Sequence, residues 1–156
     1  MEKQGGTRMR IRTMTAEDYD QVYKLWSGIR GFGLRTVDDS REGIERFLKR
    51  NPQTSVVAVK DHCVIGTILC GQDGRRGTLY HVCVAKEYRK HGVGHQMALE
   101  AIERLKQEGI NKVNLIAFKT NFIGNHFWQK FGFLARNDLN YYDFTLNTKN
   151  ITHFIE

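Results

Sequence analysis

The chain has 156 residues, of which 40% are hydrophobic and 26% charged, and its formal net charge is +7. This length fits one domain, and the apolar content is enough for a core and excludes a disordered chain. No apolar run approaches the roughly 20 residues that span a bilayer, and the polar first residues do not resemble a signal peptide. We therefore expect a cytoplasmic protein without membrane association, with a flexible tail over residues 1–8 and one domain over residues 9–156.

The N-terminal third predicts one strand and two helices. In chain order these are a strand over residues 10–13, a helix over 19–29 and a second helix over 39–51. Thr15 and Asp18 have the spacing of a capping box at the start of the first helix. Glycines at positions 28, 31 and 33 predict a flexible loop between the two helices.

The rest of the chain changes to the short alternating segments that are typical of strands. Strands are predicted over 55–60, 63–71 and 78–84, a long helix over 93–105, a fifth strand over 112–118, a short helix over 122–131 and a closing hairpin over 133–146. This order predicts an α/β (α+β) fold with a mixed, mostly antiparallel central sheet and helices on both faces. A right-handed crossover through the long helix makes the fourth and fifth strands parallel neighbours.

The positive charge favours an anionic partner, either a nucleic acid or a phosphorylated cofactor. We rank nucleic acid last, because the two N-terminal helices carry mixed charge rather than one basic face. The three cysteines are an odd number without paired spacing, and each lies in an apolar run, so reduced core thiols are expected. No metal site is predicted, since Cys-x-x-Cys pairs and His–Cys clusters are absent.

The most informative segment, residues 82–94, leads from a strand through a basic turn into the start of the long helix. The first turn of a helix has free backbone N–H groups and the positive end of the helix dipole. Gly92 and Gly94 allow a phosphate to approach the backbone without a Cβ in the way, and residues 89–91 add positive charge. The segment therefore predicts a binding site for a phosphate or pyrophosphate.

Two motifs identify the ligand. A P-loop is excluded because its Gly-Lys-Ser/Thr signature is absent, and Met97 stands where a dinucleotide fingerprint needs a third glycine. Arg-x-x-Gly-x-Gly after a strand instead resembles the pyrophosphate motif of the GNAT superfamily of N-acetyltransferases. Asn121 followed by the run from Phe127 to Phe133 is similar to the family's Asn…Tyr…Gly-Phe segment. The resemblance covers nearly the whole chain, and residues 71–77 resemble a YpeA-like branch.

The resemblance implies that acetyl-CoA is the cosubstrate and that a neutral amine attacks its thioester directly. It also implies that the fourth and fifth strands splay around the pantetheine arm and that a backbone N–H of the fourth strand polarises the thioester carbonyl. The residues that we assign to acetyl-CoA are Val82, Cys83, Val84, Arg89, Lys90, His91, Gly92, Val93, Gly94, Asn121 and Trp128. Residues 9–156 are then an N-acetyltransferase domain.

The general base stays open. The attacking amine must lose a proton, and strict alternation places Tyr80 on the face of Val82 and His81 on the opposite face with Cys83. Tyr80 has the expected direction but an unsuitable acidity. His81 has a better acidity but points away unless a bulge re-aims it.

The group that protonates the departing CoA thiolate is also open. Family members usually carry a Tyr where this chain has Trp128, whose indole cannot deliver a proton. We name Tyr80 and Trp128 as the candidate catalytic residues and expect Trp128 to pack beside the thioester.

The sequence does not identify the acceptor amine. A protein N-terminus, a lysine and a small-molecule amine all stay open, and residues 27–39 with the Tyr141-Tyr142 hairpin are expected to line the acceptor cleft. A non-catalytic acetyl-CoA sensor is the alternative to an enzyme, and a homodimer also stays open.

Overall fold

The computed structural model describes residues 8–156, so the predicted tail lies outside the described residues except for Arg8. The elements in chain order are β1 (Arg10–Thr13), the 3-10 turn η1 (Ala16–Asp18), α1 (Tyr19–Ser27), β2 (Gly33–Arg35), α2 (Arg41–Arg50), β3 (Val56–Lys60), β4 (Cys63–Gln72), β5 (Gly77–Val84), the 3-10 turn η2 (Lys86–Tyr88), α3 (Val93–Gln107), β6 (Val113–Asn114), α4 (Phe122–Phe131) and β7 (Thr152–Phe154). The predicted fourth and fifth strands are thus β5 and β6. Strand β6 covers only two residues of the predicted range 112–118, because residues 115–118 have no strand partner in the described chain.

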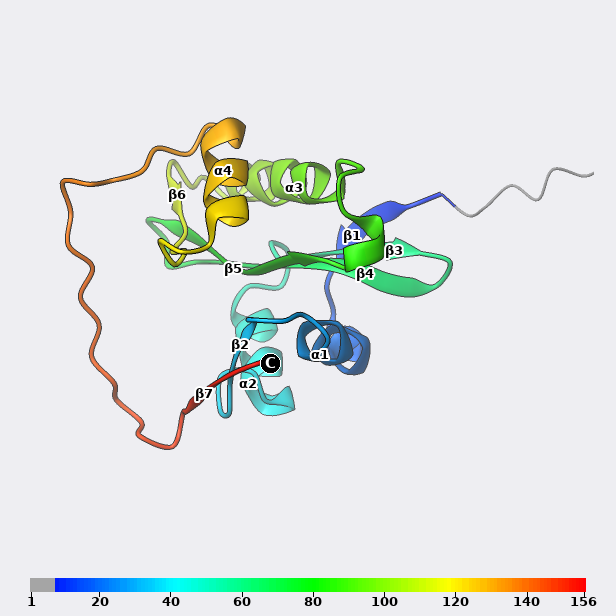
Figure 1. Ribbon diagram of the computed structural model, residues 1–156, viewed down its shortest axis with the longest axis horizontal. Coiled ribbons are helices and arrows are strands. Elements are labelled where there is room, and N and C mark those ends of the chain that lie inside the picture. Colours follow the sequence, from blue (N-terminus) through cyan, green and yellow to red (C-terminus); the bar gives the residue numbers. More distant parts are fainter. Residues whose placement is uncertain (1–7) are drawn as a thin grey trace, which may run out of the picture.

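The central sheet has the strand order β1-β3-β4-β5-β6, and only the β5–β6 pair is parallel. Helices α1 and α2 cover one face of the sheet, and α3 and α4 cover the other (Figure 1). A separate antiparallel pair joins β2 to β7. The predicted fold class, including the parallel pair, is confirmed.

Each face of the sheet has its own apolar core, because successive residues of a strand point to opposite faces. Along β3, Val56 and Ala58 pack into the cluster beneath α3, whereas Val57 and Val59 pack into the cluster beneath α1 and α2. The central strands are therefore buried on both sides. This makes the sheet a rigid platform for the residues of β5.

Three helix boundaries test the capping arguments. Thr15 and Asp18 form the predicted capping box, at the start of η1. The first helix ends at Ser27, before the predicted Ile29, where Gly28 begins the loop. The second helix starts at Arg41 with Ser40 as its N-cap, which accepts a hydrogen bond from the Gly43 N–H at 3.1 Å. Asp39, the predicted start of that helix, does not cap it, and its carboxylate pairs with His81 instead.

The largest error concerns the closing hairpin predicted over residues 133–146. The structure has no strand in residues 133–151, and the final strand is β7, which pairs with β2 in the loop that the glycines predicted. The alternating pattern of this segment suits a strand, but a strand needs a partner edge, and these residues pair with no edge of their own described chain. Among the described residues, no helix is long and apolar enough to cross a bilayer.

Candidate active site

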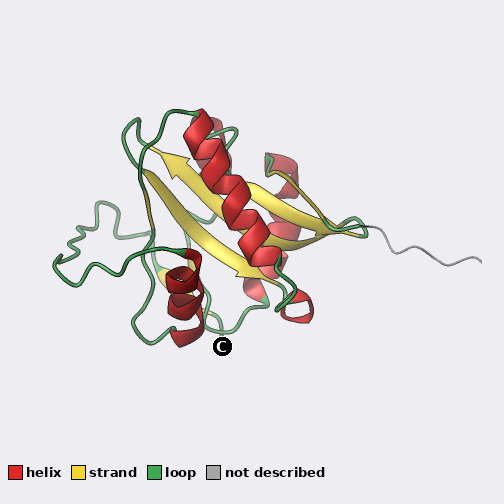
Figure 2. Ribbon diagram, turned by 90° about the horizontal axis from the view of Figure 1, so that it is seen from above, coloured by secondary structure: helices red, strands yellow, loops and turns green. Residues whose placement is uncertain are grey.

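The parallel pair β5–β6 is joined at only two positions, Gly77 with Val113 and Thr78 with Asn114. Beyond Thr78 the two strands separate, so the edge of β5 that faces β6 keeps its backbone N–H and C=O groups free of strand partners. The long helix α3 lies across the sheet and α4 lies beside it (Figure 2). This separation confirms the predicted splay and leaves the second half of β5 open to a ligand.

A β-bulge interrupts the pairing of β5 with β4. The register changes between the pairs Leu69–Tyr80 and Thr67–Cys83, so β5 uses one more residue than β4 over this interval. His81 lies within the bulge and has a φ of 49°, in the left-handed region. Such a bulge turns the side chains on its two sides out of strict alternation.

The bulge corrects the predicted directions of the β5 side chains. Tyr80 packs edge-on against Phe47 of α2, with ring centroids 6.0 Å apart, and half of its surface is exposed. His81 lies on the same face, against Trp26 and Phe32. Tyr80 and His81 therefore do not point to opposite faces, as strict alternation predicts, because alternation holds only within an unbroken ladder. The stated alternative, a bulge that re-aims His81, applies instead.

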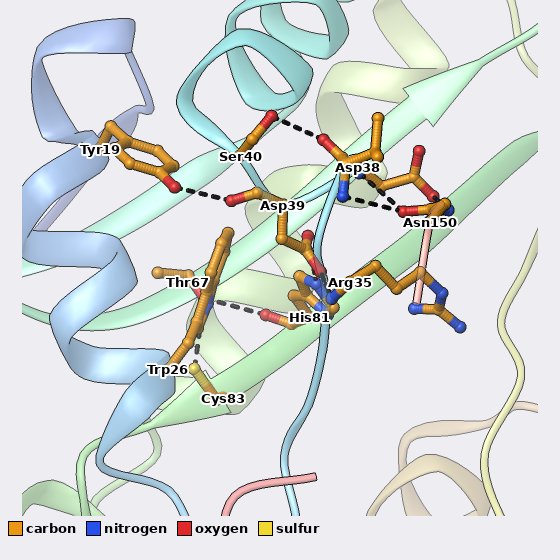
Figure 3. Close-up of polar contacts among 11 residues, drawn as sticks. Tyr19, Trp26, Arg35, Asp38, Asp39, Ser40, Thr67, His81, Cys83 and Asn150 are labelled. Atoms are coloured by element: carbon orange, nitrogen blue, oxygen red, sulfur yellow. Dashed lines mark hydrogen bonds and ion pairs between the residues drawn. The ribbon is translucent and has the colours of Figure 1, made fainter. Parts of the chain in front are cut away.

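His81 pairs with a buried carboxylate. Its Nε2 lies 2.7 Å from Oδ1 of Asp39, and the side chains are 12% and 4% exposed, respectively (Figure 3). The other carboxylate oxygen of Asp39 accepts the N–H of Arg35 at 2.7 Å, and the Tyr19 hydroxyl donates to the Asp39 carbonyl oxygen at 2.7 Å. Hydrogen bonds thus hold both the side chain and the backbone of Asp39.

The tautomer of His81 follows from this pairing. A carboxylate only accepts hydrogen bonds, so Nε2 carries the proton and Nδ1 of the neutral ring is an acceptor. None of the hydrogen bonds among residues 8–156 involves Nδ1, and no buried side-chain nitrogen lacks a partner there, so Nδ1 reaches solvent. The pair therefore offers one free imidazole nitrogen that can accept a proton.

A second chain of contacts fixes the backbone of His81. The hydroxyl of Thr67 donates to the His81 carbonyl oxygen at 2.9 Å and accepts the Trp26 indole N–H at 2.9 Å. The Thr67 hydroxyl also lies 3.3 Å from Sγ of Cys83. Burial raises the pKa of the Cys83 thiol to about 11, which keeps it protonated and unreactive at neutral pH. Cys83 can serve through its backbone, but its thiol is no nucleophile.

The loop that carries Asp39 is fastened by the C-terminal segment. The side-chain oxygen of Asn150 accepts the N–H groups of Val37 and Asp38, at 3.1 and 3.0 Å, and its amide donates to the Asp38 carboxylate at 2.8 Å. The adjoining β2–β7 pair extends this attachment. The C-terminal residues thus help to position the carboxylate that orients His81.

The basic turn and the start of α3 have the geometry of an anion site. Gly92 is the N-cap of α3 and has a φ of 80°. It has no side chain that could accept a hydrogen bond, so the first N–H groups of the helix are free to bind an anion. The three basic residues before it, Arg89, Lys90 and His91, are exposed. Arg89 is held across the turn because its Nε donates to the Val84 carbonyl oxygen at 2.9 Å. Val93 is buried and anchors the helix start in the core.

Gly94 provides a test of whether this cradle suits a ligand. A Cβ at position 94 would meet only Phe127 and Val84, at the ordinary contact distances of 3.6 and 3.7 Å. The fold therefore does not require glycine at position 94, and glycine there weakens the helix. A phosphate that approaches the backbone would require it, so the residues present fit the predicted pyrophosphate site.

The second motif lies in α4. Asn121 is the N-cap of this helix and accepts the N–H of Gly124 at 3.0 Å. Trp128 is 8% exposed and packs edge-on against Phe127 and Phe133, with centroid distances of 4.8 and 5.0 Å. Its indole N–H has no hydrogen-bond partner among the described residues. Both residues therefore have structural contacts, and their roles toward acetyl-CoA stay predictions.

The comparisons with known proteins agree with this geometry. The model of the acetyltransferase (GNAT) family matches residues 19–133.

The chain belongs to the GNAT family of acetyltransferases.

Two curated relatives carry the same activity in their names. An acetyltransferase from Sodalis glossinidius is 33% identical over 108 residues, which make up 69% of this chain and 75% of that protein. An acetyltransferase from Yersinia pestis (strain Pestoides F) is 29% identical over 113 residues, or 72% and 79% of the two chains. The placement of this GNAT protein in a YpeA-like branch stays a prediction.

Solved structures share the fold. PaiA N-acetyltransferase from Thermoplasma acidophilum, in complex with coenzyme A, has a TM-score of 0.71 at 19% identity over 93% of this chain and 96% of its own. AAC(6')-Iy in complex with the bisubstrate analogue CoA-S-monomethyl-acetylneamine has a TM-score of 0.68 at 17% identity over 89% and 99%.

Family membership makes this protein a transferase of the GNAT type that uses acetyl-CoA as cosubstrate, as the motifs predicted. The sequence did not connect His81 with the residues around it, namely Trp26, Phe32, Arg35, Asp39 and Thr67. Residues 27–39 were expected to line the acceptor cleft, but these five residues come from five different segments and carry no motif. Asp39 was noticed in the sequence only as a residue suited to start a helix, which gave no reason to connect it with His81.

Proposed function

We propose that this GNAT protein transfers the acetyl group of acetyl-CoA to a primary amine by direct attack on the thioester, with His81 accepting the amine proton. The acceptor is a protein N-terminus, a lysine side chain or a small-molecule amine. The observation that carries the proposal is the bulge in β5, which brings His81 onto Asp39 and leaves Nδ1 free.

The cosubstrate is held at two places. The free N–H groups at the start of α3, with Arg89, Lys90, His91, Gly92, Val93 and Gly94, bind the pyrophosphate. The backbone of Val82, Cys83 and Val84, on the edge where β5 and β6 diverge, binds the pantetheine arm. An N–H of this edge polarises the thioester carbonyl, as an oxyanion hole does.

The amine proton moves to Nδ1 of His81. Imidazole is the side chain whose ordinary pKa lies nearest neutral pH, which suits a general base. The Asp39 carboxylate keeps the proton on Nε2 in the resting state and stabilises the positive imidazolium after transfer. Asp39 is therefore a positioning residue, and His81 is the catalytic one.

The departing thiolate needs little help. A free thiol has a pKa of about 8.5, so its thiolate is a fair leaving group. Water or Tyr80 can supply the proton, and Trp128 packs beside the thioester without delivering one. Tyr80 is half exposed on the face of His81, which supports this assignment. The hairpin expected to bring Tyr141 and Tyr142 to the site does not form, so neither is assigned as a donor.

A non-catalytic acetyl-CoA sensor is the second candidate, and Trp128 is the observation that favours it. Replacement of the usual Tyr by an indole removes the family's proton donor. If Trp128→Tyr creates a turnover that the natural protein lacks with every acceptor, the sensor is the correct function.

The experiment that tests the proposal follows release of free CoA from acetyl-CoA with a panel of peptide N-termini, lysine peptides, polyamines and small amines. Amine-dependent release that saturates with one acceptor class supports an enzyme. Acetyl-CoA binding without release from any acceptor contradicts it.

Three further features belong to this proposal. Residues 9–156 act as one N-acetyltransferase domain, of which residues 19–133 match the family model. Its location is the cytoplasm, because three unpaired cysteines are typical of a reducing compartment. The active form is a homodimer.

A further inference from the structure

Residues 134–148, here called the arm, are detached from the rest of the molecule. No helix or strand includes them, and no backbone hydrogen bond joins residues 134–146 to other parts of the described chain. Figure 1 shows the arm running away from the sheet after α4 and returning only at β7. Its apolar side chains are largely exposed, with Leu134 at 84%, Phe144 at 88% and Leu146 at 93%.

The arm has the sequence of a half-buried strand. Tyr142, Phe144 and Leu146 recur at every second residue, with Asp143 and Thr145 between them. In an extended chain the first three share one face and the other two share the opposite face. Such a pattern is typical of a strand that covers a core on one side, yet within residues 8–156 its apolar face is left 85–93% exposed.

A matching open edge lies on the same molecule. Strand β6 is the last strand of the central sheet, and its outer edge has no strand partner in the described chain. In the continuation of β6, Leu115 packs against the core, whereas Ile116 and Phe118 are 64% and 66% exposed. The ring centroids of Phe118 and Phe154 lie 5.9 Å apart, so the exposed side chains that follow β6 adjoin the two-stranded β2–β7 sheet.

We propose that the arm of one copy pairs with the β6 edge of a second copy, and that the exchange is reciprocal. The arm and the edge occur on the same chain, so two copies related by a two-fold axis satisfy both surfaces at once. A strand added to an open edge gains main-chain hydrogen bonds as well as apolar contacts. Tyr142, Phe144 and Leu146 then cover Ile116 and Phe118.

Charge and area suit this occupant. The arm has two acidic and one basic side chain, whereas the exposed Lys112 and Lys119 flank β6 and its continuation, so the arm and the edge carry opposite charge. Three aromatic rings on the arm and in the continuation of β6 are 66–88% exposed: Phe118, Tyr142 and Phe144. Their exposed parts amount to about 350–600 Å² per copy at about 150–250 Å² for each ring. A standard interface buries about 800 Å² per partner, so these rings supply about half of one or more.

Disulfide trapping tests the exchange directly. In a Cys63→Ser background, which removes the exposed cysteine, Ile116→Cys is combined with Tyr142→Cys, Phe144→Cys or Leu146→Cys in turn. We expect at least one pair to give a covalent dimer on a non-reducing gel, and Ile116→Cys with Thr145→Cys, on the opposite face, to give much less. A covalently closed monomer would show that the arm folds back onto its own chain and would overturn the proposal, as would no cross-link in any pair.

Light scattering gives an independent test. The natural chain should be a dimer, Leu146→Asp should be monomeric, and Thr145→Asp should stay dimeric. Leu146 is exposed in the single copy, so its substitution leaves the fold of that copy unchanged, which circular dichroism checks. A monomeric natural chain, or a Leu146→Asp variant that is still dimeric, would overturn the proposal.

Discussion

Gly94→Ala separates what the fold needs at the start of α3 from what acetyl-CoA needs. The added Cβ makes only ordinary contacts with Phe127 and Val84. Replacing glycine by alanine in a helix stabilises it by about 0.5–1 kcal/mol. For a chain of this size that corresponds to a rise in Tm of about 1–4 °C without ligand.

The effect on binding has the opposite sign. The same Cβ keeps the phosphate from the backbone N–H groups, and the loss of one hydrogen bond to a charged group costs about 1.5–3 kcal/mol. The Kd for acetyl-CoA should rise about 10–150-fold. At a concentration of about 100 times the natural Kd, ligand stabilisation should fall from about 2.7 to 1.4 kcal/mol or less.

Thermal unfolding with and without acetyl-CoA measures both effects, and calorimetric titration gives the Kd. Gly28→Ala is a matched control, because position 28 has a right-handed helical φ of −95° and equally ordinary contacts for a Cβ, at 3.6–3.7 Å. It should leave the acetyl-CoA response unchanged. An unaltered Kd in Gly94→Ala would refute the assignment of Gly94 to the phosphate site.

Four other variants probe the cofactor site, α4 and the fold. Arg89→Glu with Gly92→Glu should abolish the acetyl-CoA-dependent rise in Tm, and an undiminished rise would contradict the basic-turn site. Trp128→Phe should keep most of kcat, because packing survives and the indole N–H has no protein partner, whereas Trp128→Ala should lower the free energy of unfolding in urea by about 3–5 kcal/mol. Burial alone would raise the pKa of Asp18, but hydrogen bonds from Arg12 and the Thr15 N–H lower it overall. Asp18→Asn should therefore cost about 1.5–3 kcal/mol at pH 7, a difference that shrinks as pH falls below about 4; a pH-independent difference would exclude the charge as its source.

The sequence predicted well those features that depend on neighbouring residues. The order of helices and strands from β1 to α4, except for β2, follows from local spacing, as do the capping box at Thr15 and the glycine cradle at Gly92. The parallel, splayed pair followed from the handedness of a crossover and from the family resemblance.

The sequence could not predict the features that depend on distant partners. The bulge at His81 arises from the register between β5 and β4, which no residue of β5 encodes alone. Asp39, which orients His81, is 42 residues away and was equally suited to start a helix. The arm illustrates the same limit: its alternation predicts a strand that the described chain does not form, because local alternation does not supply a partner edge.

The rate of CoA release by His81→Asn tests the central claim most directly. Asn tolerates the left-handed φ of 49° at position 81, so the bulge should persist while the base is lost. His62→Asn is the matched control, because His62 has a φ of 64°, is exposed and lies in the β3–β4 turn. We predict that His81→Asn lowers kcat about 10²–10⁴-fold with an unchanged Kd for acetyl-CoA, whereas His62→Asn keeps the natural rate. Full turnover by a folded His81→Asn variant would contradict the account.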